Sequence, residues 1–281
     1  MTVLSQPLAR AAEQGELHNL LPPGSAAAAE FAAASARYRR GLTVMVCGRA
    51  GVGRDTLARA LRERLSVTAI GPGEQAAAAA DADLWIMLLA GMPRRTDHAL
   101  LSALPADRTI VVLGKADTFG EPQVAAEMAA QAGAALGRSV LPVSPLLACA
   151  AVSADELQLL RELVAAGAQM PSMSAYFLAG CPPGSDERRL RVGLLRRVDA
   201  YGLDIAMALI RDGHPAAADP QSLADALRGY SGIDGVGAAI AGLVERVRYW
   251  RGVELRGALE RAAAAGHDRD AIEELLGAGG G

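Results

Sequence analysis

Short, uninterrupted apolar segments alternate with amphipathic segments through the middle of the chain. The apolar segments are rich in Val, Ile and Leu and lack alternating polar residues, which is typical of strands buried on both faces. They occupy residues 42–47, 67–70, 84–90, 109–113 and 140–143. Helical spacing occupies residues 55–65, 74–82, 94–104, 121–136 and 153–167. This alternation predicts an α/β domain with a parallel, doubly wound sheet, whose ligands bind at the carboxyl ends of the strands.

Both ends of the chain show helical spacing alone. In residues 1–40, Leu4, Leu8 and Ala11 fall on one stripe and predict a first helix, and Ser25 is predicted to cap a second one. In residues 169–281, a long helix is predicted to open at 185–187, with further helices near 220–229, 235–250, 252–265 and 268–276, and a disordered tail at 277–281. The chain is therefore divided into three zones: 1–40, 41–168 and 169–281.

Composition narrows the classes of protein. Hydrophobic residues make up 51% of the chain but aromatic residues only 4%, so the core is expected to consist of Leu, Val, Ile and Ala. The net charge is −3 and basic residues form no long block, which gives no support to nucleic-acid binding. The three cysteines form no C-x-x-C pair, and no signal peptide or membrane-spanning run is visible, so a reduced cytoplasmic location is expected.

A glycine-rich segment follows the first predicted strand. Residues 48–56 read GRAGVGRDT and outline the phosphate loop G-x-x-x-x-G-K-[ST], with a strand before it and a helix after it. Backbone N–H groups in this segment would cradle phosphates at the helix N-terminus. The alternative is a glycine-rich turn that binds nothing. The predicted phosphate-binding residues are Gly48, Gly51, Val52, Gly53, Arg54, Asp55 and Thr56.

Two residues of this segment depart from the motif. Arg54 stands where the motif has its lysine, and it keeps the positive charge on a larger, planar group. Asp55 stands where the motif has the hydroxyl that holds Mg²⁺. Asp55 could ligate Mg²⁺ itself, or it could serve only as a favourable acidic residue in the first turn of a helix.

A second motif lies at the end of the fourth predicted strand, at residues 114–117 (GKAD). Together with the glycine-rich segment, it makes the chain resemble P-loop GTPases of the Era and dynamin-like type, whose guanine-recognition motif is N/T-K-x-D. The resemblance implies that Lys115, the chain's only lysine, packs over the guanine and that Asp117 accepts its N–H groups. It also implies that Ser144, in PVSPL, belongs to the loop whose backbone contacts the base oxygen. The alternative is a solvated lysine beside an Asx turn.

The resemblance fails where such GTPases hold the metal and the γ-phosphate. Residues 67–73, followed by residues 80–87, resemble the segment of these GTPases that contains the magnesium-linked aspartate. Ile70 stands at the place of that aspartate. Only a few residues separate the predicted helix ending at 65 from the next strand, where the family has its switch I segment. The resemblance therefore implies GTP or GDP as the ligand. The departures from the family's pattern give little support to Mg²⁺ binding and leave no residue to which catalysis can be assigned.

These patterns lead to three hypotheses. The first is a degenerate GTPase domain at 41–168, flanked by helices that form a bundle or stalk, as in bacterial dynamin-like proteins. It would bind guanine nucleotide weakly or not at all and act by pairing with a true dynamin-like GTPase or a second copy. The second is a slow GTPase with an atypical loop, and the third is a nucleotide-free adaptor. Arginines at 188, 189, 191, 196 and 197 would either face anionic lipid at the inner membrane surface or form a solvated, ion-paired face.

Overall fold

The structure is a computed structural model that describes residues 3–73, 82–171 and 173–277. It contains two compact units. The first is built from both ends of the chain, Met1–Leu42 and Ala241–Gly281, and the second is Thr43–Ile240. The three zones predicted from the sequence divide the chain differently, because residues 169–240 belong with the sheet and the last helices belong with the first ones. Helical spacing identifies helices but does not reveal which of them share a core.

The second unit is built on a five-stranded sheet in which every pairing is parallel. The strands are β1 (Thr43–Cys47), β2 (Thr68–Ile70), β3 (Leu84–Leu89), β4 (Thr109–Leu113) and β5 (Val140–Pro142), in the order β2-β1-β3-β4-β5. All five predicted strands are confirmed, with ends shifted by at most one residue. The order reverses between β1 and β3, which is the topological switch point where doubly wound sheets bind ligands.

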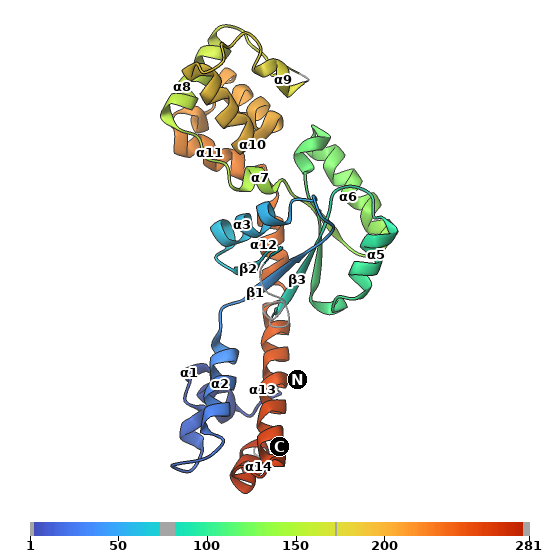
Figure 1. The fold of residues 1–281 in the computed structure, drawn as a ribbon, viewed down its shortest axis with the longest axis vertical. Coiled ribbons are helices and arrows are strands. Elements are labelled where there is room, and N and C mark those ends of the chain that lie inside the picture. Colours follow the sequence, from blue (N-terminus) through green and yellow to red (C-terminus); the bar gives the residue numbers. More distant parts are fainter. Residues whose placement is uncertain (1–2, 74–81, 172, 278–281) are drawn as a thin grey trace. The chain divides into compact units, whose positions relative to one another are not determined.

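Helices cover both faces of this sheet. Figure 1 shows α3 (Arg54–Leu65) and α12 (Ile233–Ala241) on one side and α5 (Arg95–Ser102) and α6 (Pro122–Leu136) on the other. Met87, Leu89, Val111 and Leu113 share a core cluster with alanines of α6, whereas alternate residues of the same strands face the opposite side. With helices on both faces, the strands are buried on both sides, which explains their uninterrupted apolar sequence.

The rest of the second unit is a helical segment with a core of its own. It comprises α7 (Pro145–Ala148), α8 (Ala154–Ala165), α9 (Ser174–Phe177), α10 (Asp186–Arg211) and α11 (Pro220–Gly229). Leu194 and Val198 of the predicted stripe are buried in this core, and Leu190, Tyr201 and Ile205 pack against it. Asp199 interrupts α10 with φ 57° and ψ −178°, a backbone conformation that residues other than glycine rarely adopt.

The first unit packs helices from both ends of the chain. It contains α1 (Gln6–Gln14), α2 (Ala28–Arg39), α13 (Val244–Ala264) and α14 (Arg269–Gly277). Leu8, Phe31, Leu259 and Ile272 are buried together in its core. The predicted cap at Ser25 is wrong, because α2 begins three residues later. Instead, the Ser25 hydroxyl accepts a hydrogen bond from the N–H of Ala27 and donates one to Asp268.

One predicted helix boundary is also wrong. The sequence predicted a break near residue 251, but α13 runs through Gly252, and the break lies at residues 242–243. Gly252 is buried within this helix, and a Cβ there would stand 3.6 Å from Leu4, an ordinary van der Waals distance, so the glycine neither ends the helix nor is required by the packing. The predicted helix at 74–82 and tail at 277–281 fall almost entirely outside the described residues. No helix in the described part of the chain has the length and apolarity needed to cross a membrane.

Candidate functional site

The glycine-rich segment connects β1 to α3 at the switch point of the sheet. Its three glycines have positive φ angles: 142° at Gly48, 78° at Gly51 and 99° at Gly53. Gly48 is also confined, because a Cβ there would stand 2.6 Å from the carbonyl oxygen of Leu88 on β3. These values explain the spacing of the glycines, since residues with a side chain rarely adopt positive φ angles.

The backbone N–H groups of this segment have no acceptor among the described residues. Within the described part of the chain, none of the hydrogen bonds has an N–H group of residues 50–56 as its donor, and the first bond of α3 runs from Leu57 to the carbonyl of Gly53. The N-terminus of a helix also carries a partial positive charge. Val52 is buried and fixes the middle of the loop. A loop of this geometry suits an anion with several oxygen atoms, such as a phosphate.

Asp97 on α5 holds the start of this loop, and it was missed by the sequence analysis. Its carboxylate is 1% exposed and accepts a hydrogen bond from Nε of Arg49 at 2.8 Å and from the N–H of Arg94 at 2.9 Å. The loop after β1 is thus tied to the loop after β3, across the switch point. An acid at the third position of a helix is a known capping signal, but nothing in the sequence indicated Arg49 as its second partner.

Arg54, Asp55 and Thr56 lie in the first turn of α3, with Asp55 exposed and the other two partly buried. The Asp55 carboxylate points toward the end of β2, where a Cβ on Gly71 would stand 3.6 Å from its Oδ1. Burial raises the pKa of the Cys47 thiol at the end of β1, and the nearby charge of Arg54 lowers it in part. Arg54 therefore lies close to the strand that leads into the loop.

The residues present do not fit a magnesium site of the family's kind. Ile70 is 4% exposed and belongs to the core, so the position of the metal-linked aspartate has no oxygen to offer. Asp55 is one carboxylate, and Mg²⁺ in nucleotide sites is held by protein oxygens together with substrate phosphates. Among the described residues, no group of three or more His, Cys, Asp or Glu side chains is arranged to hold a metal ion.

The predicted guanine loop follows β4. Lys115 is exposed with φ 56°, and Asp117 is partly buried in the short 3₁₀ helix η3 (Ala116–Phe119). Gly114 stands where the family has Asn or Thr, and a Cβ there would lie 2.7 Å from Cδ1 of Leu88. A larger residue at this position would therefore have to displace the end of the Leu88 side chain. Because Gly48 and Gly114 both abut Leu88, the structure brings the two predicted loops to opposite sides of one residue on β3.

Ser144 is engaged within the fold. Its hydroxyl accepts from the N–H of Leu147 at 3.5 Å, and its own N–H donates to the carbonyl of Ser231 at 2.8 Å. The next residue, Pro145, has no N–H group. The backbone of this loop therefore offers no donor at these two positions to a base oxygen. Ser144 caps a helix and is 1% exposed, and its contact with a base stays a prediction.

Helix α10 lies beside the guanine loop. Burial raises the pKa of the Tyr201 hydroxyl on α10, and the negative charges of Tyr230 and Asp117 raise it further. Asp117 is thus close enough to the Tyr201 hydroxyl to affect the pKa of that group. The helical segment that follows the sheet consequently contributes aromatic groups to the surroundings of the predicted base site.

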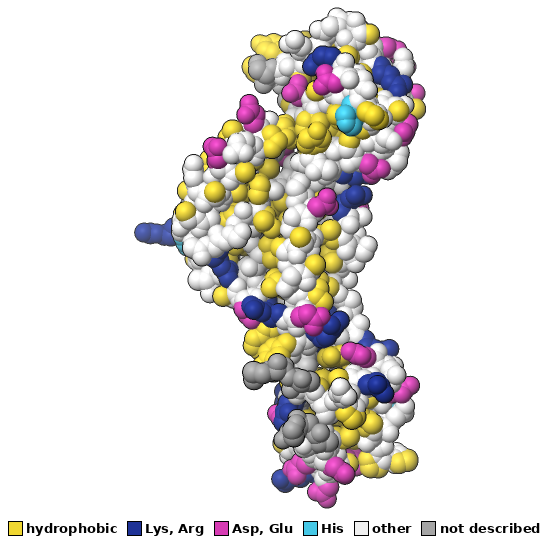
Figure 2. Space-filling view, turned by 180° about the vertical axis from the view of Figure 1, so that it is seen from behind, with side chains coloured by type: hydrophobic (Ala, Val, Ile, Leu, Met, Phe, Trp, Pro, Cys, Tyr) yellow, Lys and Arg dark blue, Asp and Glu magenta, His cyan; other side chains and the backbone are white. Residues whose placement is uncertain are grey.

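Charges of both signs are mixed on the surface. On the face drawn in Figure 2, Lys and Arg side chains are interspersed with Asp and Glu over both units.

In comparisons with known proteins, no family model matches the chain and no curated protein matches it significantly.

Proposed function

We propose that the second unit is a degenerate GTPase-like domain that binds the phosphates of a guanine nucleotide in the loop between β1 and α3. The observation that supports this most strongly is the run of N–H groups at residues 50–56 without acceptors in the described chain, on a loop shaped by three left-handed glycines. The loop lies at the switch point, where doubly wound sheets receive ligands. Arg54 adds a charge that attracts phosphate.

The base preference rests on fewer residues. Lys115 and Asp117 follow β4, and the glycine-rich loop follows β1. Only β3 lies between these two strands in the sheet, so one ligand could contact both loops. Asp117 keeps the acceptor that recognises the N–H groups of guanine. Since Ser144 donates to Ser231 and Pro145 lacks an N–H, the base oxygen loses its usual donors. We therefore expect guanine to be preferred over adenine by a small margin.

The proposal includes weak or absent hydrolysis. Phosphoryl transfer depends on positioning and on charge stabilisation by a metal and by basic groups. Buried Ile70 cannot hold a metal-bound water, and Asp55 adds a negative charge beside the phosphates. A domain of this kind would act by association, and its partner would be a true dynamin-like GTPase or a second copy of this chain. A slow GTPase and a nucleotide-free adaptor are the competing functions.

Thermal melting with GTP, GDP and ATP tests the proposal, each with and without Mg²⁺. A ligand at about a hundred times its dissociation constant stabilises the folded state by about 2.7 kcal/mol. We expect GDP and GTP to raise the melting temperature of the second unit, and ATP to raise it less. Asp117→Ala is expected to remove the difference between GTP and ATP without removing the shift caused by either.

The loop itself needs a separate control. Arg54→Ala is expected to reduce the melting shift for every nucleotide, because it removes a positive charge that attracts the phosphates of all of them. If millimolar nucleotide leaves the melting temperature of the wild-type protein unchanged, the nucleotide-binding proposal is wrong and the adaptor function remains. Phosphate release above background that is lost in Asp117→Ala would instead identify a slow GTPase.

A further inference from the structure

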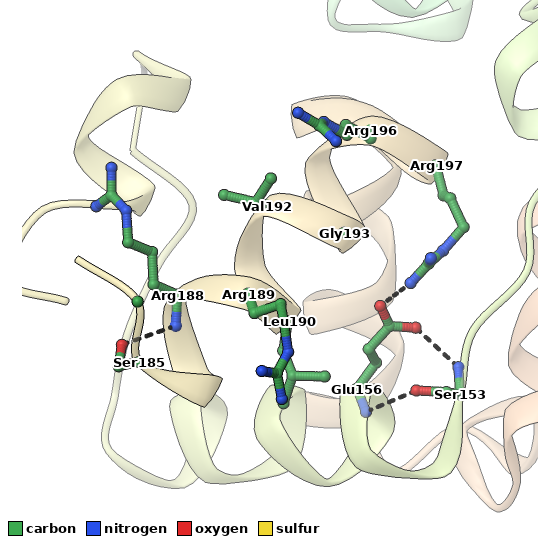
Figure 3. A pocket seen from close by; sticks show the side chains of 11 residues that line it. Ser153, Glu156, Ser185, Arg188, Arg189, Leu190, Val192, Gly193, Arg196 and Arg197 are labelled. Atoms are coloured by element: carbon green, nitrogen blue, oxygen red, sulfur yellow. Dashed lines mark hydrogen bonds and ion pairs between the residues drawn. The ribbon is translucent and has the colours of Figure 1, made fainter. Parts of the chain in front are cut away.

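A cavity of about 640 Å³ lies between the N-terminal end of α8 and the first half of α10, away from the glycine-rich loop. Figure 3 shows that its lining comes from these two helices and from the turn that precedes α10. Four of its lining residues are arginines and one is a glutamate, so the lining has a clear excess of positive charge. We call this cavity the arginine pocket and define it by Arg188, Arg189, Arg196, Arg197, Glu156 and Ser185.

The single acid in the arginine pocket is already neutralised. Glu156 is 2% exposed, and its carboxylate accepts hydrogen bonds from the Arg197 guanidinium and from the N–H of Ser153 at 2.9 Å (Figure 3). Gly193 leaves room for this pair, since a Cβ there would stand 3.1 Å from Oε1 of Glu156. Arg197 and Glu156 therefore form the fixed wall of the pocket, and the remaining arginines determine its charge.

The other three arginines are held by weak or uncharged partners. Arg188 donates to the carbonyl oxygens of Leu178 and Cys181, which leaves its charge uncompensated. Arg189 pairs with Asp186, but both side chains are largely exposed, and exposed pairs of this kind contribute little. Arg196 is exposed, and no ion pair or hydrogen bond of its side chain is found within the described residues.

The N-termini of two helices line the arginine pocket, one toward each end of it (Figure 3). Ser153 caps α8 and Ser185 caps α10, and both serines line the arginine pocket. Each N-terminus adds a partial positive charge at its own end of the pocket. Glu187 lies two residues after Ser185 in the chain. Its carboxylate is paired with Arg191, so it does not neutralise the arginines that line the pocket.

We propose that the arginine pocket binds a phosphate-bearing anion. Arginine forms paired hydrogen bonds to two oxygens of one phosphate, and a site lined by several arginines from one helix is suited to a group with more than one phosphoryl oxygen. The anion can be soluble, such as a polyphosphate, or can be the headgroup of an anionic lipid. This inference does not rest on the function proposed for the glycine-rich loop, because no residue is shared between the two sites.

The test uses the full chain with inorganic pyrophosphate in calorimetric titrations, and with sedimented vesicles of phosphatidylcholine, either alone or mixed with phosphatidylglycerol. Arg196→Glu and Arg189→Glu should each weaken binding about tenfold, as expected for the loss of a charge-assisted bond. Arg211→Glu is the matched control, because it reverses an exposed charge on the same helix outside the pocket. Circular dichroism checks that each variant folds.

Each outcome decides the proposal. Binding of pyrophosphate that is weakened by Arg196→Glu and Arg189→Glu but not by Arg211→Glu supports a soluble anion. Binding to phosphatidylglycerol vesicles alone, with the same order of variants, supports a headgroup. Equal weakening by Arg211→Glu, or no binding of either probe, overturns the pocket. Binding that is lost in Arg54→Ala but kept in Arg196→Glu assigns the anion to the glycine-rich loop and overturns the pocket as well.

Discussion

Gly48→Ala is expected to lower the free energy of unfolding of the second unit by about 4 kcal/mol. Two effects add at this position. The φ angle of 142° lies in a region that alanine rarely adopts, and the new Cβ would meet the carbonyl oxygen of Leu88 at 2.6 Å. Leu88 lies on the central strand β3, so neither backbone can move without disturbing the pairing of β1 with β3.

Gly51→Ala is the matched control for this prediction. Gly51 also has a positive φ angle, 78°, but no atom lies within 4 Å of its Cβ position. It should cost only about 1 kcal/mol, the conformational term alone. The measurement is urea unfolding in a Trp250→Phe background, where Trp85 of β3 is the remaining tryptophan of the two in the chain. Equal losses for the two variants would contradict the crowding at Gly48.

Asp97→Ala is expected to destabilise the same unit by about 3 kcal/mol. The change removes the cap of α5, since the Arg94 N–H loses its acceptor. It also leaves Arg49 without its partner in the loop, and Arg49 has a side chain that is only 24% exposed. Because the same carboxylate anchors the glycine-rich loop, nucleotide-dependent stabilisation should fall along with stability.

Asp97→Asn separates the two contributions of Asp97. The amide oxygen can still accept from the Arg94 N–H, but the charge that pairs with Arg49 is gone, so about half of the loss is expected. The variant is measured by the same Trp85 fluorescence and by the melting shift with GDP. A stability within about 0.5 kcal/mol of the wild type for Asp97→Ala would show that the buried ion pair contributes nothing net.

The sheet could be predicted because its strands are buried on both faces. A run such as residues 109–113 (TIVVL) has one polar residue, at its first position, and the structure confirms these bounds. The positions of the three loop glycines also carried information, since each has a positive φ angle. By contrast, Gly252 has helical geometry inside α13, so the sequence pattern misplaced a helix break there.

The parts that escaped prediction depend on contacts between distant residues. Asp97 is 48 positions from Arg49, and no local pattern connects them. The N–H of Ser144 is engaged by the carbonyl of Ser231, so a motif that looked available to a ligand is used by the fold itself. Sequence spacing shows which residues share a strand or helix. Whether a backbone N–H is already engaged in a hydrogen bond depends on the packing of the whole unit.

The first unit has its two halves at opposite ends of the chain, and this affects the order of folding during synthesis. Residues 43–240 leave the ribosome before residues 241–281, so the sheet can fold while α1 and α2 still lack α13 and α14. Until then, apolar side chains such as Phe31 and Leu8 have no core to enter. During every round of translation, the N-terminal helices thus pass through a period in which they are open to chaperones or to the same helices of another nascent chain.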